Sequence, residues 1–151
     1  MPLRQRQIDE LTTPGTIDAK YSRGGLVEVE YTVQYLQVLH GNRLPAIRTP
    51  HTLKALEALA QGGVLSPTEA RLLHEAYQFF RRLIDALRVV RGNARDLVLP
   101  PTDSAEFTFL ARRLGYWEDS GTPAQLAQDI ALHTQRAARI YDECFRVPAP
   151  Y

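Results

Sequence analysis

The sequence predicts an all-α protein, a single helical bundle of about five to six helices preceded by a short irregular N-terminal segment. Apolar residues recur at helical spacing in the longest segments, capping residues mark where helices begin, and glycine marks where they end. The 151 residues have the length of one domain. A domain of this size buries roughly 70% of its unfolded surface, which is enough for a core.

The N-terminal segment is expected to be only loosely part of this bundle. Residues 1–11 are polar with sparse apolar positions, which predicts a weak amphipathic helix. Pro14-Gly15 then signals a turn, and a short extended piece is expected at 17–21. We interpret residues 1–22 as a helix and linker that come from a preceding domain.

The segment 25–40 has the features of both a strand and a helix. Apolar and polar residues alternate from Val27 to Tyr35, which favours a strand. The run before Gly41 is, however, much longer than a usual strand of about five or six residues. We therefore expect a helix at 25–40 that lies between two partners, with two apolar stripes on nearly opposite sides. The first stripe is Leu26, Val29, Val33 and Leu36, and the second is Val27, Tyr31, Tyr35 and Val38.

The four later helices are predicted from the residues at their ends. Each begins at a capping residue followed by proline or, three residues on, by glutamate, and each has glycine or proline beyond its end. The bundle is placed at 23–147 and a tail at 148–151. The expected starts are Thr49-Pro50, Ser66-Pro67 with Glu69, Asp103 with Glu106, and Thr122-Pro123. The first helix is expected to end before Gly62, and the others at Val90, Leu114 and Phe145.

Composition argues against several classes of function. The 18 basic and 17 acidic residues give a net charge of +1, so no field of one sign attracts nucleic acid or an acidic membrane. No apolar stretch is long enough for a membrane helix. The single cysteine, Cys144, fits a reducing, cytoplasmic setting and the apolar stripe of its helix. The four histidines lack the spacing of a zinc site.

The basic residues Lys20 and Arg23 and the pair Gly24-Gly25 precede the helix at 25–40. Glycine lets a ligand approach the backbone, and a helix N-terminus supplies donors, so this point could receive a phosphate or a carboxylate. There is no P-loop or G-x-G-x-x-G pattern. Taken alone, the residues favour a structural glycine turn.

Glu28 and Glu30 resemble the carboxylate pair with which nucleotidyltransferases hold Mg²⁺. On a strand the two side chains would share a face, whereas on a helix they diverge by about 200°. The helix interpretation therefore excludes a shared metal, and a strand at 27–35 would restore it. Glu28 is instead favoured by the positive end of the helix, and Glu30 and Gln34 belong to a polar stripe.

Two residues of the predicted helix at 67–90 stand out from its core stripe. Arg81 could reach an anion or a partner, although charged residues opposite an apolar stripe are usually solvated. Phe79 lies off the stripe and indicates that this helix, too, is covered on a second side.

The chain resembles a known family in several segments. In the segment RGGLVEVEYTVQYL, a glycine pair is followed by two acidic residues and then by a V/I-Q-Y-L sequence. This pattern resembles one in bacterial glutamine synthetase adenylyltransferases, in the helical domain behind the catalytic domain. Uridylyltransferases of the PII protein have a looser version of it. RTPHTLKALEALAQGG, EAYQFFRRLIDALR and FLARRLGY also have counterparts there. Glu28 stands where the family usually has Asp, and Ile84 and Ala86 replace a common glutamate and arginine. The motif positions are Arg23, Gly24, Gly25, Glu28, Glu30, Gln34, Tyr35, Tyr77 and Arg81.

The resemblance implies a helical domain that does not itself carry out catalysis. The family's Asp-x-Asp pair belongs to a preceding nucleotidyltransferase domain, and this chain has no Asp-x-Asp. We expect the chain to brace that domain and to complete its nucleotide cleft through Lys20, Arg23 and the helix that starts at Gly25. ATP and Mg²⁺ would be cofactors of the parent protein and not of this chain, and the parent would act on glutamine synthetase and respond to PII.

Two rival hypotheses remain. The chain could be a stand-alone interaction or dimerisation module that uses the second apolar stripe. It could also be an enzyme that uses Glu28, Glu30 and a metal.

Overall fold

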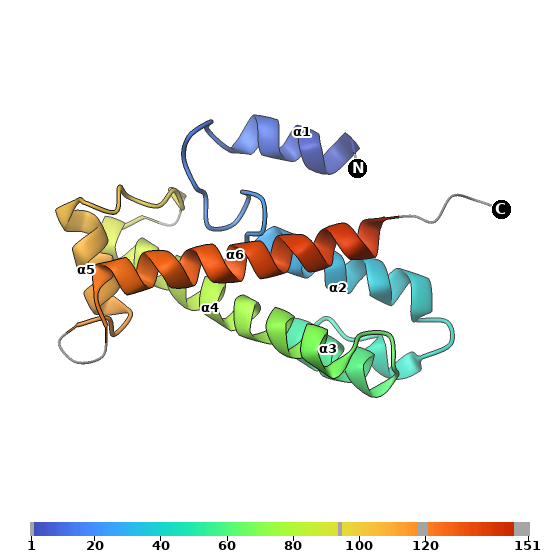
Figure 1. Ribbon diagram of the computed structural model, residues 1–151. Helices are drawn as coiled ribbons and strands as arrows, with labels where there is room; N and C mark the ends of the chain where they lie inside the picture. Colours follow the sequence, from blue (N-terminus) through green and yellow to red (C-terminus); the bar gives the residue numbers. More distant parts are fainter. Residues whose placement is uncertain (1, 94, 118–120, 147–151) are drawn as a thin grey trace.

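The computed structural model describes residues 2–93, 95–117 and 121–146, and this part is almost entirely helical (Figure 1). It contains no strand, and only one isolated β-bridge, between Asp18 and Val98. The all-α prediction is confirmed. The elements are α1 (Pro2–Leu11), α2 (Leu26–His40), the short 3₁₀ helix η1 (Pro45–Ile47), α3 (Thr52–Gln61), α4 (Pro67–Arg91), α5 (Ala105–Arg113) and α6 (Pro123–Phe145).

The two long helices, α4 and α6, form the centre of the bundle. They pack against each other and both pack against α2, while α3 covers α2 and α4, and α5 covers α4 and α6. Helix α1 runs along the outside of the bundle (Figure 1). The side chains that fill the centre are fully buried and include Val29, Leu73, Phe80, Leu83 and Ile140.

Helix α2 confirms the helical interpretation of 25–40. Its first apolar stripe is buried throughout. Along the second stripe, Val27 is 5% exposed, Tyr31 and Tyr35 are half-buried, and Val38 is 83% exposed. The prediction that partners cover both sides of this helix was therefore wrong for its last turn.

Two helices begin as predicted from local sequence. At α4, the Ser66 side chain accepts from the backbone N–H of Glu69, whose carboxylate accepts in return from the Ser66 backbone N–H. At α6, Thr122 caps the first turn by accepting from Gln125. Such caps satisfy backbone donors that the helix leaves unpaired.

The predicted start of α3 at Thr49-Pro50 was wrong. The side chain of Gln37 donates to the carbonyls of Ile47 (2.7 Å) and Thr49 (2.8 Å), and this holds the segment in a non-helical path. Thr49 accepts from the His51 N–H, and the helix begins at Thr52.

The predicted cap at Asp103 was also wrong, by one residue. Ser104 caps α5, because its hydroxyl accepts from Phe107 at 3.1 Å.

The extended piece predicted at 17–21 is shorter than expected. Only its first part pairs with the segment before α5, through Leu99 N–H to Ile17 O and Ala19 N–H to Leu97 O. The Asp18 carboxylate then accepts from the N–H groups of Lys20 (2.8 Å) and Tyr21 (2.9 Å), which turns the chain instead of extending it.

Two predicted core contacts are confirmed. Phe79 is 6% exposed and stacks on His133 of α6 with ring centroids 4.4 Å apart, so α4 is covered on a second side. Cys144 packs against the core, and burial raises the pKa of its thiol to about 11. The predicted tail at 148–151 lies outside the described residues. Among the described helices, none combines the length and apolarity required to cross a membrane.

Candidate functional site

The turn that leads into α2 lies directly against α6. Gly24 has φ +72°, and a Cβ there would be 2.1 Å from the backbone oxygen of Thr134. A Cβ on Gly25 would meet three backbone oxygens, those of Ala19, Lys20 and Ser22, each at 3.0 Å. The glycine pair is thus required by close packing of backbone on backbone, as the structural interpretation of the turn predicted.

The carboxylate of Glu28 lies at the centre of this turn and is fully buried. Its Oε2 accepts from the backbone N–H of Gly24 at 2.8 Å, and its Oε1 accepts from Arg23 at 2.8 Å and from Arg4 at 3.3 Å. The first turn of α2 adds its positive dipole end. Hydrogen bonds to a charged group are about twice as strong as neutral ones, which offsets the cost of burying the charge.

Arg4 ties α1 to this carboxylate. Its side chain is only 4% exposed. Besides Glu28, it donates to the carbonyls of Tyr21 (2.6 Å) and Ser22 (3.2 Å) and to the side chain of Gln7 (3.1 Å). One guanidinium therefore joins α1, the turn and α2.

Arg23 extends the cluster to α6. One side-chain nitrogen donates to both carboxylate oxygens of Asp142, at 2.7 and 2.8 Å, and the guanidinium lies 5.6 Å from the ring centroid of Tyr141. Burial opposes its positive charge, but the hydrogen bond to Asp142 and the charges of Glu28 and Asp142 outweigh burial and raise the pKa of Arg23. Because 44% of this side chain is exposed, the network reaches the surface here.

Of the predicted site residues, the cluster contains Arg23, Gly24, Gly25 and Glu28. Lys20 lies beside it, with Nζ 5.2 Å from the centroid of the Tyr21 ring.

Three others lie elsewhere. Glu30 is half-buried on another side of α2, Gln34 is exposed one turn later, and Arg81 is exposed on α4. No interaction among the described residues joins these three to Glu28. The helical geometry of α2 also removes the strand that a shared metal on Glu28 and Glu30 would need.

Sequence reasoning did not identify Arg4. The residue lies in a weakly amphipathic helix, and its partner Glu28 is 24 positions away. No local pattern signals such a contact.

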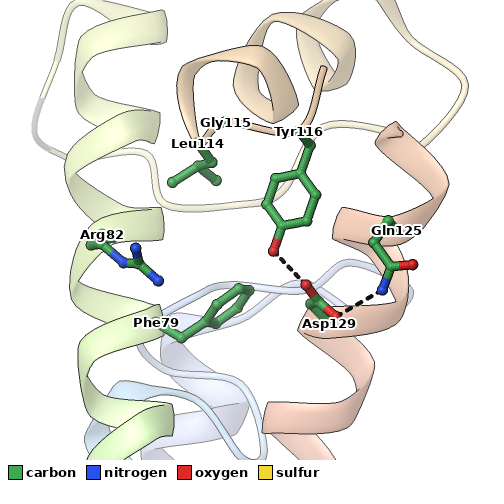
Figure 2. A pocket seen from close by; sticks show the side chains of 7 residues that line it. All are labelled: Phe79, Arg82, Leu114, Gly115, Tyr116, Gln125 and Asp129. Carbon is green, nitrogen blue, oxygen red and sulfur yellow. Dashed lines mark hydrogen bonds between the residues drawn. The ribbon is translucent and has the colours of Figure 1, made fainter. Parts of the chain in front are cut away.

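Away from this cluster, a polar hollow of about 310 Å³ lies between α4, the end of α5 and the start of α6 (Figure 2). Asp129 accepts from the Tyr116 hydroxyl and from the side-chain amide of Gln125, and Arg82 reaches into the hollow from the opposite helix. Burial, together with the hydrogen bond to Asp129, raises the pKa of Tyr116 to about 12. The hollow contains no predicted site residue.

Gly24→Ala is expected to destabilise the protein by about 2–5 kcal/mol, because a left-handed residue with a Cβ costs about 1–2 kcal/mol and overpacking adds about 1–3 kcal/mol. Gly92 is the matched control. It has a similar φ of +68°, and no atom lies within 4 Å of the position that a Cβ would take, so Gly92→Ala should cost only about 1–2 kcal/mol. Urea unfolding measures both, and equal losses would contradict the packing role of Gly24.

Glu28→Gln should cost about 3–5 kcal/mol, because it leaves the buried guanidinium of Arg4 without its counter-charge. Glu30→Gln, on the same helix but outside the cluster, should change stability by less than about 0.5 kcal/mol. The measurement is again urea unfolding. A Glu28 variant as stable as the Glu30 variant would show that the cluster does not hold the turn.

Comparison with known proteins places this fold in context. Residues 3–145 match the family model described as GlnD PII-uridylyltransferase. The chain is also similar to bifunctional glutamine synthetase adenylyltransferase/adenylyl-removing enzymes. It is 38% identical over 130 residues to that of Streptomyces avermitilis (86% of this chain, 13% of the relative) and 39% identical over 122 residues to that of Stenotrophomonas maltophilia (80% and 13%). For Bordetella pertussis the identity is 32% over 128 residues (85% and 13%), so the chain spans only about an eighth of these relatives.

Proposed function

We propose that this chain, which belongs to the GlnD PII-uridylyltransferase family, is a non-catalytic helical domain. In this proposal it braces the nucleotidyltransferase domain of a glutamine synthetase adenylyltransferase-like protein. The parent would transfer AMP from ATP to glutamine synthetase and remove it again, in the regulation of nitrogen metabolism. The observation that carries the non-catalytic role is the complete burial of Glu28 under three donors.

The chain's own carboxylates do not fit a catalytic Mg²⁺ site. Both oxygens of Glu28 already accept hydrogen bonds from Gly24, Arg23 and Arg4, and Glu30 lies on another side of the helix. Within residues 2–93, 95–117 and 121–146, no three His, Cys, Asp or Glu side chains come close enough to hold a metal. We therefore assign ATP and Mg²⁺ to the nucleotidyltransferase domain of the parent.

The way in which the N-terminal segment is attached supports the proposed bracing role. Arg4 fixes α1 to the turn and to α2, so the direction in which the chain enters the bundle is set by buried, charged hydrogen bonds. Beside the point where the chain enters the bundle, two of the predicted site residues, Arg23 and Lys20, reach the surface. In the proposal they face the nucleotide cleft of the catalytic domain, and contacts with glutamine synthetase and PII, in the cytoplasm, run through the parent protein.

The proposal is tested with the isolated chain and with the nucleotidyltransferase domain of the Streptomyces avermitilis relative. Alone, the chain should yield no adenylylated product from ATP, Mg²⁺ and glutamine synthetase, and accumulation of product would refute the non-catalytic role.

Calorimetry should show that the isolated chain binds the nucleotidyltransferase domain. Lys20→Glu should weaken the affinity about tenfold, because it reverses a charge at the contact. Lys54→Glu, on α3, is the matched control. Absence of binding, or equal effects of the two variants, would contradict the bracing surface.

A second candidate function, a dimerisation or interaction module, is favoured by one specific observation. The last turn of α2 exposes Val38 (83%) and Leu39 (53%), and Leu3 of α1 is 79% exposed nearby along an apolar hollow of about 390 Å³ that Leu3 and Val38 both line. Exposed apolar patches of this kind mark interaction sites in other proteins.

If this exposed apolar patch joins two copies of the chain, light scattering should give the mass of a dimer. Val38→Glu should then give a monomer with an unchanged circular dichroism spectrum. Val89→Glu, at a 58% exposed valine on α4, is the control and should leave the mass unchanged. A monomeric wild-type chain would exclude the dimer.

A further inference from the structure

We propose that the pocket between α1, the glycine turn and the end of α6 binds a small organic oxyanion, a carboxylate or a phosphate ester attached to an apolar group. This site goes beyond the bracing role and does not depend on it, because all of its residues belong to this chain. The pocket has a volume of about 360 Å³, within the range of small-molecule sites.

Three arginines from three segments line this pocket. Arg4 comes from α1 and Arg23 from the turn, and Arg146 is the C-cap residue that directly follows α6. Arg4 and Arg23 already donate to Glu28, to Asp142 and to backbone carbonyls, so they contribute mainly charge. Arg146 presents its whole fork of N–H donors, which matches the two oxygens of a carboxylate or phosphate. Arg4 is 4% exposed, so one of the three charged groups is built into the interior.

The charges of the pocket leave a surplus of one positive charge. Glu28 and Asp142 together balance Arg4 and Arg23 through the ion pairs of the cluster. Arg146 forms no ion pair with a described residue. An anionic ligand therefore fits the pocket better than a neutral one or a cation.

Tyr141 provides a second, independent indication of a ligand. The residue lines the pocket and is only 4% exposed, yet its hydroxyl has no hydrogen-bond partner among the described residues. Buried polar groups are nearly always hydrogen-bonded. Burial, and then the nearby charge of Glu28, raise the pKa of this hydroxyl, so it stays protonated and able to donate.

The remaining walls suit the apolar part of such a ligand. The rings of Tyr141 and Phe145 lie 4.4 Å apart between centroids, and Ile8 of α1 also lines the pocket. Inorganic phosphate would bind Arg146 but leave this apolar wall without contacts. An aromatic or aliphatic acid would use both.

The experiment is an NMR titration of the complete chain with four probes: benzoate, phenyl phosphate, inorganic phosphate and neutral benzyl alcohol. Benzoate or phenyl phosphate should bind saturably and shift the signals of Arg23 and Tyr141, and the tighter of the two identifies the class of oxyanion. Inorganic phosphate should bind more weakly than phenyl phosphate. Equal binding of benzyl alcohol, or no saturable shift with either aromatic acid, would overturn the proposal.

Three variants separate binding from a structural role. Arg146→Gln should raise the Kd about tenfold, and Tyr141→Phe about threefold, since each removes donors to the ligand. Tyr141→Phe removes a hydroxyl that has no partner, so its unfolding curve should match that of the wild type or shift to higher urea. Arg113→Gln, at an exposed arginine on α5, should leave the Kd unchanged. If Arg146→Gln and Tyr141→Phe both bind as tightly as wild type, the assigned pocket is wrong.

Discussion

The buried carboxylate of Glu28 is the interaction on which the arrangement of this protein depends. Removing a carboxylate from water costs several kcal/mol unless charged and polar donors replace its hydration. Here the donors are Arg4 of α1, Arg23 of the turn and the backbone N–H of Gly24. Arg23 also donates to Asp142 and so connects this carboxylate to α6. Four parts of the chain therefore share one electrostatic centre, and moving α1, the turn or the start of α2 would leave a buried charge unpaired.

Local chemistry predicts much of the fold and stops where distant residues intervene. The capping box at Ser66 and the threonine cap at Thr122 involve neighbours three residues apart, so the sequence alone identifies them. The false start at Thr49 has the same local signature, but the side chain of Gln37 captures the carbonyls around it. The sequence contains no local sign of that competition, because the two partners belong to different elements.

The candidate site divides in the same way. The glycine pair and the acidic residue behind it are visible in the sequence, and the helical geometry that separates Glu28 from Glu30 follows from the length of the run. Arg4, by contrast, is recognised only once the fold brings α1 against the turn. The carboxylate pattern that resembles a metal pair on a strand thus becomes, on a helix, an internal anchor and a neighbouring surface residue.

The contact of Gly24 with Thr134, together with the ion pair between Arg23 and Asp142, has a consequence for the order of folding. The paired residues Arg23 and Asp142 are 119 positions apart. Contacts across so long a loop form late, because the chain must first lose the entropy of closing the loop. During synthesis the start of α2 therefore lacks its contacts with Thr134 and Asp142 until α6 has left the ribosome. The contacts of Arg4 with the turn and with Glu28 span only 17 to 24 positions and can form earlier, so α1 is attached to α2 before this joint unit is fixed to α6.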